Sequence, residues 1–461
     1  MRIKLKPINE QVVVLAGATS GIGRETARQF ARNGAQVVVS GRDQTAVDRV
    51  VDEIRAMGGE ASGYAADVSD FDQMRALAQS AVETYGHLDT WVHLAAVSVY
   101  SRFEDTRPDE FRRVLEVNLL GQMYGALAAL PHIKHEGRGS LIHVSSIEAQ
   151  RSFPYQSAYS ASKHGIPGFL DSLRVELRDE GMPITVTNIM PGSINTPLFN
   201  KALTRIGVKP RPYPPVYEPE VVAQAILYAA SHPVRELYVG GAARSFGMMQ
   251  RAVPKITDQM IAVTGFEGQR TDVMKKPDAP HNLYEHIQGH DTVHGEFSDQ
   301  ARSFSIVTWL RIHPWVRRGL TAALLIGGGL LAWQAIRQRN NRLGMQGMRG
   351  MQGMRRMRSM RAMRNLRNRM SRVGDSRFVQ RARNLPQAIF PIRPRRRIGP
   401  VLLPGRVGPV KLRGQVGPVK IPVHIGPVPV PERLQGMQVG PYPLPRMFTA
   451  DGVRRNGKWL R

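Results

Sequence analysis

Between residues 11 and 240, short apolar runs alternate with longer amphipathic stretches. The runs are apolar throughout, which is typical of strands covered on both faces, and the stretches between them have helical length. This βαβ alternation predicts an α/β fold with a Rossmann-like, doubly wound parallel sheet over residues 1–250. The predicted strands are VVVLAG at 12–17, AQVVVSG at 35–41, DTWVHLAA at 89–96, SLIHVSS at 140–146, ITVTNIMPG at 184–192 and ELYVGG at 236–241.

Residues 251–315 are polar and show no coherent helical pattern, so we expect an irregular connecting region there. Histidines recur in this region at intervals of four or five residues, at His281, His286, His290 and His294. We interpret them as surface residues and predict no metal site. A shared metal site is the alternative interpretation.

A single hydrophobic segment follows at residues 316–337, and its centre at 319–336 carries no charge. This length is just enough to cross a bilayer, so we predict a transmembrane helix; a buried or self-associating helix is the alternative. A true span places the flanking parts of the chain on opposite sides, whereas a re-entrant segment keeps both on one side. The absence of a charged face favours the span. We expect membrane association, with the first domain in the cytoplasm.

The chain beyond this segment is basic and repetitive. Residues 301–461 hold 33 Lys and Arg against 3 acids, which accounts for the net charge of +27. Residues 338–397 form an Arg/Met-rich low-complexity segment, 398–445 carry nine-residue Gly-Pro-Val repeats, and 446–461 form a basic tail. Methionines on a three-residue period do not stay on one helix face, so they predict no packing seam. The repeat prolines favour an extended array, with a stacked solenoid as the alternative.

Such a tail has the charge to bind anionic lipid or another polyanion. Sequence-specific nucleic-acid recognition is disfavoured, because residues 342–397 hold only the aromatic residues Phe378 and Phe390. The chain has no cysteine, which excludes disulfides, thiolate zinc sites and a cysteine nucleophile. Any catalysis must therefore use other side chains.

A glycine-rich loop joins the first predicted strand to the first predicted helix. It comprises Gly17, Ala18, Thr19, Ser20, Gly21, Ile22 and Gly23. Glycines let the chain turn sharply there and let backbone N–H groups approach a pyrophosphate at the helix N-terminus. The position between a strand and a helix predicts a dinucleotide site, and a tight turn without a ligand is the alternative.

The end of the second strand discriminates between the two nicotinamide cofactors. A carboxylate there binds the adenosine ribose, whereas this chain has Ser40 and Arg42, whose hydroxyl and guanidinium suit a 2′-phosphate. The sequence therefore favours NADP over NAD, with a solvated surface arginine as the alternative role of Arg42. Asp67 follows the third strand and is a candidate acceptor for the adenine amino group or a helix N-cap.

Tyr159 and Lys163 are four residues apart and therefore share one face of the predicted helix. A phenol with a pKa near 10 is a poor catalyst at neutral pH, and we expect the neighbouring lysine to lower that pKa. Ser146 ends the strand before this helix, where its hydroxyl is a candidate donor to a substrate oxygen.

The segments AGATSGIG, VVVSGR, ADVS, VNLLG, HVSS and YSASKHG occur in this order within residues 11–200. Together they resemble the short-chain dehydrogenase/reductase family, and the following PGSINTP resembles its segment beside the nicotinamide. The resemblance implies hydride transfer between a nicotinamide and a carbonyl or alcohol carbon, in dimers or tetramers as a rule. We therefore expect an enzyme that uses NADP and acts on a small carbonyl or alcohol substrate, with a homo-oligomer possible in principle.

The resemblance also implies roles for individual residues. Tyr159 is the expected general acid/base, Lys163 binds the nicotinamide ribose and assists Tyr159, and Ser146 polarises the substrate oxygen. Asn118 is expected to hold a water that connects Lys163 to solvent. The expected cofactor-binding residues are Gly17, Thr19, Ser20, Gly21, Ile22, Gly23, Ser40, Arg42, Asp67, Ala95, Tyr159, Lys163, Ile194 and Thr196.

The chain departs from the family at one motif, because residues 93–96 are His-Leu-Ala-Ala where the family usually has Asn-Asn-Ala-Gly. This change supports an alternative function, a non-catalytic NADP-binding scaffold or sensor whose basic tail binds anionic lipid or another polyanion. The retained Ser146, Tyr159 and Lys163 favour an active enzyme. Residues 197–220 are the expected lid, and their Phe199, Tyr213 and Tyr217 indicate a lipophilic or ring-bearing substrate.

Overall fold

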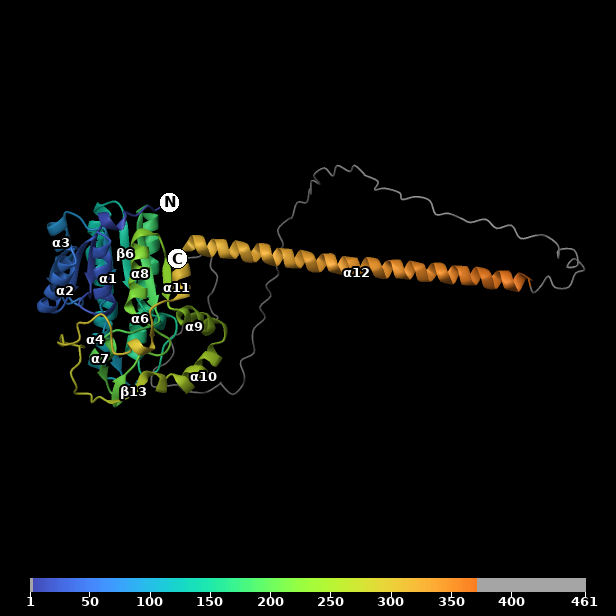
Figure 1. Cartoon of the computed structure of the whole chain (residues 1–461). Helices are drawn as coiled ribbons and strands as arrows, with labels where there is room; N and C mark the ends of the chain where they lie inside the picture. The colour runs from blue at the N-terminus through green and yellow to red at the C-terminus, as the bar shows by residue number, and fades with distance from the viewer. Residues whose placement is uncertain (1–2, 371–461) are drawn as a thin grey trace, which may run out of the picture. The chain divides into compact units, whose positions relative to one another are not determined.

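Seven parallel strands form the central sheet of the computed structural model, which describes residues 3–370 (Figure 1). The strand order is β12-β7-β6-β4-β1-β2-β3, so the order reverses between β1 and β4. This sheet confirms the Rossmann-like, doubly wound fold predicted from the sequence. The strands are β1 (Val12–Ala16), β2 (Gln36–Gly41), β3 (Glu60–Ala65), β4 (Thr90–His93), β6 (Gly139–Val144), β7 (Ile184–Pro191) and β12 (Glu236–Val239).

Alternate side chains of the strands enter two separate cores. Val13 and Leu15 of β1 pack into the core formed with α1 (Gly21–Arg32), α2 (Gln44–Ala56) and α8 (Pro219–Ser231). Val12 and Val14 pack on the other face with α3 (Phe71–Tyr85), α5 (Gly121–His135) and α6 (Ser157–Asp179). Both faces of the sheet are therefore apolar, which explains why the strand segments are continuous apolar runs.

Short polar signals fix the ends of the helices. The side chain of Asp43 accepts a hydrogen bond from the backbone of Ala46 and caps α2, and Asp70 caps α3 in the same way. Helix α3 ends at Gly86, whose φ of 87° is in the left-handed region. Helix α4 (Pro108–Leu115) passes through a π-helical turn, Glu116–Leu120, directly into α5.

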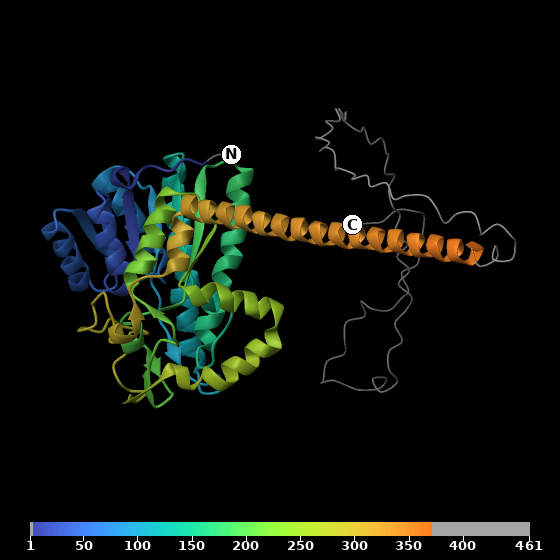
Figure 2. The same ribbon diagram turned by 45° about the vertical axis from the view of Figure 1, so that its right-hand side comes forward.

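Short elements surround the carboxyl ends of the strands. Helices α9 (Gly241–Ala252) and α10 (Pro254–Thr264) form a V-shaped pair there (Figure 2). The others there before residue 251 are β5 (Val99–Tyr100), a 3₁₀ turn at Ile147–Ala149, β8 (Ser193–Ile194), α7 (Leu198–Lys201), β9 (Leu203–Thr204), β10 (Val208–Pro210) and β11 (Val216–Tyr217). A 3₁₀ turn at Ile8–Glu10 precedes β1 at the amino end of the sheet.

Residues 251–315 contain regular elements where the sequence indicates an irregular connection. Besides α10, they include 3₁₀ turns at Glu267–Gln269 and Ser298–Gln300, β13 (Arg270–Met274), β14 (Ala301–Arg302) and α11 (Ile306–Ile312). Strand β13 pairs with β10, and β14 pairs with β11. Each of these strands pairs with a strand that is distant in sequence, so no local hydrophobic period predicts it.

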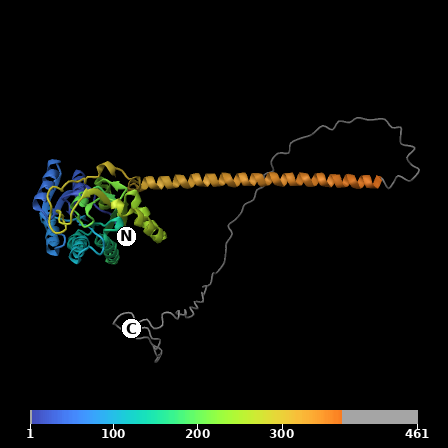
Figure 3. The same ribbon diagram turned by 90° about the horizontal axis from the view of Figure 1, so that it is seen from below.

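Residues 281–297, which we call the strap, have neither helix nor strand and run beside the first half of the domain (Figure 3). Three buried apolar side chains anchor the strap, namely Leu283, Val293 and Phe297, and Asp291 is buried as well. Their spacing follows neither the helical nor the strand period, which is why the sequence pattern does not reveal them. Of its histidines, His281, His286 and His290 are half-buried and His294 is exposed.

The predicted hydrophobic segment lies in α12 (Pro314–Met370). Its residues Pro314–Arg337 are long and apolar enough to cross a membrane, with a mean hydropathy of 1.6 and no part buried against the protein. Met354, Met357, Met360 and Met363 are exposed, so these described methionines form no packing seam. The Gly-Pro-Val repeats at 398–445 and the basic tail at 446–461 lie outside the described residues.

Candidate active site

A cavity of about 270 Å³ lies at the carboxyl ends of the central strands, next to the reversal in strand order. A doubly wound sheet binds its ligands at this position, because neighbouring strand ends diverge there. The cavity wall contains fourteen of the residues singled out in the sequence: Gly17, Thr19, Ser20, Gly21, Ile22, Gly23, Arg42, Asp67, Ala95, Ser146, Tyr159, Lys163, Ile194 and Thr196. Ser40 and Asn118 are buried and do not line the cavity.

The glycine-rich loop is shaped for close approach of backbone and ligand. A Cβ on Gly23 would lie 2.1 Å from the carbonyl oxygen of Gly17, and one on Gly17 would lie 2.5 Å from the backbone nitrogen of Ala95. Gly17 also has a φ of +92°, which glycine adopts without strain. The loop opens α1 as predicted, but the Gly21 N–H donates to the carbonyl oxygen of Thr292 in the strap at 2.9 Å.

Arg42 is not a freely solvated side chain. Its guanidinium donates to the carbonyl oxygens of Asn282 at 2.7 Å and Tyr284 at 2.9 Å, both in the strap. Burial lowers the pKa of Arg42 from its ordinary value. Next to it, the Ser40 hydroxyl is fully buried and has no hydrogen-bond partner within residues 3–370.

Asp67 borders the same part of the cavity and does not cap a helix. Its carboxylate accepts hydrogen bonds from the Ser69 backbone at 2.9 Å and from the Arg113 guanidinium at 2.7 Å. Burial pushes the pKa of Asp67 upward, but the bonds from Ser69 and Arg113 outweigh burial and leave the pKa below its ordinary value. The ionised carboxylate therefore remains available as a hydrogen-bond acceptor.

Tyr159 and Lys163 lie on one face of α6, as their spacing predicts. The Lys163 ammonium is 5.4 Å from the centre of the Tyr159 ring, and it donates to the carbonyl oxygen of Val144 at 3.0 Å. Both side chains are buried in the cavity wall, and the Ser146 hydroxyl hydrogen-bonds with the Tyr159 phenol. The three residues predicted to act together are therefore neighbours in space.

The protonation of this group differs from the sequence expectation. Burial and then the charge of Glu148 raise the pKa of Tyr159, while Ser146 opposes them. Burial also lowers the pKa of Lys163 to about 7, and Glu148 opposes that change. The pKa of Tyr159 is therefore raised where the sequence analysis expected it to be lowered, because loss of hydration and the charge of Glu148 outweigh the effect of Ser146.

Glu148 is a cavity residue that the sequence analysis missed. It lies in the 3₁₀ turn after β6, is 7% exposed, and accepts a hydrogen bond from the Ser160 hydroxyl at 2.5 Å. Burial raises its pKa to about 8, although Ser160 and Lys163 act in the opposite direction. An acidic residue two positions after Ser146 at the end of a buried strand was the available signal.

Asn118 lies behind the cavity in the π-helical turn. Its amide nitrogen donates to the Val97 carbonyl at 2.9 Å and to the Ser162 hydroxyl at 3.2 Å, and its oxygen accepts from the Val97 backbone at 2.8 Å. These bonds connect the start of α5 to α6 and to the loop after β4. A water held between Asn118 and Lys163 stays a prediction.

The altered His-Leu-Ala-Ala motif keeps the sheet intact. His93 is fully buried and stacks on His143, with ring centres 6.2 Å apart and planes at 11°. The backbone nitrogens of Leu94 and Ala95 donate to the carbonyl oxygen of Ala16 at 2.8 and 3.0 Å. Where the family usually has two asparagines, this chain thus has a histidine stacked on His143 and a leucine whose backbone N–H bonds Ala16.

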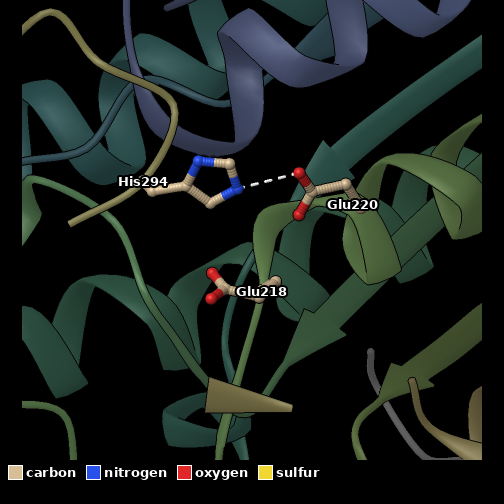
Figure 4. A group of neighbouring side chains, drawn as sticks. All are labelled: Glu218, Glu220 and His294. Carbon is tan, nitrogen blue, oxygen red and sulfur yellow. Dashed lines mark hydrogen bonds and ion pairs between the residues drawn. The ribbon is translucent and has the colours of Figure 1, made fainter. Parts of the chain in front are cut away.

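One polar group attaches the strap to the start of α8 (Figure 4). His294 pairs with Glu220 at 2.8 Å, and Glu218 accepts a hydrogen bond from Asn195 at 3.0 Å. Their ligand atoms lie within 4.8 Å of one another, as in a metal site. His294 and Glu220 pair with each other and Asn195 bonds Glu218, so we assign the group a structural role in holding the strap.

Aromatic side chains form the other end of the cavity. Phe199, Tyr213 and Tyr217 of the predicted lid line it, as do Phe153 and Phe246. The Phe153 ring lies 5.0 Å from that of Tyr213, and Phe246 contacts both rings. The cavity therefore has a polar end near the glycine-rich loop and an aromatic end beneath the lid.

Comparison with known proteins identifies the family. The model for short chain dehydrogenases matches residues 11–206. The uncharacterised oxidoreductase YxnA of Bacillus subtilis (strain 168) is 35% identical over 340 residues, which cover 73% of this chain and 93% of that protein. The chain belongs to the short-chain dehydrogenase/reductase family. The likeness between this short-chain dehydrogenase and YxnA extends beyond the residues that the family model matches.

Two further comparisons concern activity and fold. Cyclohexanol dehydrogenase of Acinetobacter sp. (strain SE19) is 33% identical over 231 residues, which cover 50% of this chain and 91% of that enzyme. A short-chain dehydrogenase/reductase from Burkholderia phymatum, solved in complex with NAD, superposes with a TM-score of 0.50. It is 22% identical over 55% of this chain and 96% of its own, so this second likeness concerns the fold alone.

We predict that Glu148 makes the stability of this short-chain dehydrogenase depend on pH. Its pKa rises on folding from about 4.5 to about 8, so the folded state binds a proton that the unfolded state releases between these values. The contribution of Glu148 to the free energy of unfolding should therefore be complete below the lower value and decline up to the higher one.

Urea unfolding at both ends of this pH range should show the unmodified protein losing stability relative to Glu148→Gln as pH rises. The matched control is Glu104→Gln at an exposed position, which should follow the unmodified protein. Parallel curves for the unmodified protein and Glu148→Gln would contradict the prediction.

Proposed function

We propose that this short-chain dehydrogenase is an NADP-dependent oxidoreductase that interconverts a carbonyl and an alcohol on a lipophilic substrate. The supporting observation is the convergence of Ser146, Tyr159 and Lys163 on one cavity that also contains the glycine-rich loop. When bound, NADP supplies or accepts a hydride at C4 of its nicotinamide ring. The residues described below bind this cofactor, orient the substrate and move the proton.

The residues at the polar end fit a dinucleotide with a 2′-phosphate. Gly17 and Gly23 allow close approach to a pyrophosphate, and Arg42 offers a cation where a carboxylate would select NAD, whereas the Ser40 hydroxyl is buried and does not line the cavity. Asp67 suits the adenine amino group, and Ile194 and Thr196 lie at the expected nicotinamide end of the cavity. We assign NADP as the cofactor from these side chains.

The proton moves between the Tyr159 phenol and the substrate oxygen. Ser146 donates a hydrogen bond to this oxygen as negative charge develops there, and Tyr159 protonates it. The raised pKa of Tyr159 keeps the phenol protonated, which suits an acid and therefore carbonyl reduction. In the reverse direction, the Lys163 ammonium beside the ring favours the phenolate.

The aromatic end of the cavity supports a lipophilic substrate. Phe153, Phe199, Tyr213, Tyr217 and Phe246 surround it. Rings of this kind favour flat or alicyclic molecules that bury apolar surface. The similarity to cyclohexanol dehydrogenase supports an alicyclic or aromatic ketone and its alcohol.

Tyr159→Phe should retain NADPH binding and lose turnover by at least about 10²-fold, because it removes only the hydroxyl that transfers the proton. Turnover is measured with a panel of cyclic ketones and alcohols, and binding by quenching of tryptophan fluorescence. Tyr228→Phe is the matched control, since Tyr228 lies in α8 and does not line the cavity. Near-normal turnover of Tyr159→Phe contradicts the proposed role. A protein that binds NADPH yet turns over no member of the panel favours the non-catalytic alternative.

Arg42→Ala should weaken NADPH binding by about tenfold more than NADH binding, as expected for loss of a charge-assisted contact to the 2′-phosphate. Arg42 also bonds the strap, but loss of that contact affects both cofactors alike. Arg49→Ala is the matched control, because Arg49 bonds strap residue Asp291 at 2.6 Å and does not line the cavity. An unchanged ratio of the two affinities in Arg42→Ala would refute the assignment of NADP.

We further propose that residues Pro314–Arg337 attach the enzyme to a membrane, with the catalytic domain in the cytoplasm. The segment is 24 residues long and is not buried against the protein. Exposed arginines follow it at Arg355, Arg356, Arg358, Arg361, Arg364 and Arg367, which suits contact with anionic headgroups. Such lipid binding by the basic tail and assembly into a homo-oligomer stay predictions.

The full chain should sediment with membranes, resist extraction by high salt and dissolve in detergent. Leu324→Asp combined with Leu331→Asp should shift it to the soluble fraction, because each charge costs about 2.5–3.5 kcal/mol at the centre of a span. Leu127→Asp, at an exposed position of the catalytic domain, is the control and should remain on the membrane. Release of the unmodified chain by salt alone would show electrostatic attachment instead of a span.

A further inference from the structure

Lys201 is a buried cation beside the glycine-rich loop that neither the family resemblance nor the catalytic roles use. It is the last residue of α7, is 6% exposed and lines the cavity. Its ammonium donates to the Ser20 hydroxyl at 3.1 Å. Ser20 directly precedes α1 and makes no capping bond to that helix. Lys201 thus places a positive charge at the N-terminus of α1, the part of the cavity suited to a pyrophosphate.

The strap supplies the partner of this lysine. Asp291 is 8% exposed, and its carboxylate lies 3.5 Å from the Lys201 ammonium. The same carboxylate pairs with Arg49 at 2.6 Å, and Arg24 donates to the Asp291 carbonyl oxygen. Asp291 therefore already has an arginine partner for its negative charge. The Arg49 side chain is half-exposed, so Asp291 shares its negative charge between a buried lysine and an arginine at the surface.

Two cations held close together away from water repel each other, which is costly unless an anion joins them. Burial lowers the pKa of Lys201, Asp291 opposes this change, and the nearby charge of Arg42 lowers the pKa further. Lys201 and Arg42 are therefore two cations in one cavity that repel each other when no anion lies between them. Anionic phosphate groups would relieve this repulsion.

The strap also changes the donors available at the helix terminus. The carbonyl oxygen of Thr292 accepts the Gly21 N–H, so this donor does not face the cavity. Thr292 follows Asp291 directly in the strap. The Thr292 carbonyl oxygen accepts the Gly21 N–H, and the neighbouring Asp291 carboxylate pairs with the Lys201 ammonium. The Lys201 ammonium can donate to an anion in the cavity in place of the Gly21 N–H.

We propose that Lys201 binds the pyrophosphate of the nicotinamide dinucleotide, with Asp291 of the strap as its positioning residue. The proposal rests on the proposed function only in requiring that this cavity binds a nicotinamide dinucleotide. Asp291 lies outside the residues 11–206 that the family model matches, so the extension after the core domain completes the phosphate site.

The test is the affinity of Lys201→Met for NADPH and NADH, measured by calorimetry on the full chain. Both affinities should fall by at least about tenfold and by similar factors, because the pyrophosphate is common to both cofactors. Lys201→Arg should recover most of the loss. The matched control is Lys209→Met, since Lys209 pairs with strap residue Glu296 and does not line the cavity. Its affinities should stay within about twofold of the unmodified protein.

Asp291→Asn separates phosphate binding from attachment of the strap. If Lys201 binds the pyrophosphate and Asp291 holds it in position, this variant should lose affinity for both cofactors by a clearly smaller factor than Lys201→Met, because the ammonium that binds the anion remains. Equal losses in Lys201→Met and Asp291→Asn would overturn the proposal and show that the lysine only anchors the strap. Unchanged affinity in Lys201→Met, or a loss confined to NADPH, would overturn it as well.

The outcomes for the proposed function are distinct from these. Preference of the unmodified protein for NADH would refute the assignment of NADP, while equal losses for both cofactors in Lys201→Met would still support the lysine. Thermal unfolding of each variant identifies any that fail to fold. If Lys201→Met fails to fold, the affinities of Lys201→Arg are compared with those of the unmodified protein instead. A Lys201→Arg variant that folds and binds neither cofactor would count against the proposal.

Discussion

A parallel sheet with helices packed on both faces can present polar side chains to a ligand only at the ends of its strands. In this chain the two apolar cores on either side of β1 impose that constraint. The strand order reverses next to β1, so the carboxyl ends of neighbouring strands diverge and leave room for a cavity. The glycine-rich loop, Arg42 and Asp67 follow the first three strands. Ser146 and Thr196 follow strands on the other side of the reversal.

Burial determines the protonation of the titratable side chains that lie at the carboxyl ends of the strands. The phenol of Tyr159 and the carboxyl of Glu148 are shifted toward their neutral forms, and the ammonium of Lys163 is shifted in the same sense. Loss of hydration is the first cause in all three cases, and the charges of neighbours are secondary. The Tyr159 phenol is thus kept protonated by its surroundings, and its deprotonation depends on how other charges enter the cavity.

The fold and most of the cavity could be predicted because their signals are local. Continuous apolar strands, a glycine-rich turn and a Tyr and Lys four residues apart each lie within one short segment. Glu148 was missed because an acid after a strand has no meaning until burial and Ser160 are known. Lys201 and Asp291 are far apart in sequence, and nothing in either segment indicates that they meet. The strap was missed for the same reason, since its anchors Leu283 and Phe297 follow no period.

The strap also sets an order of events during synthesis of the chain. The glycine-rich loop and the catalytic helix leave the ribosome early, but Asp291 and Thr292 reach them only after most of the catalytic domain has emerged. The hydrophobic segment Pro314–Arg337 follows almost at once. The nascent domain therefore completes this side of its cavity at nearly the same time as the translation machinery meets a segment that is long and apolar enough to cross a membrane.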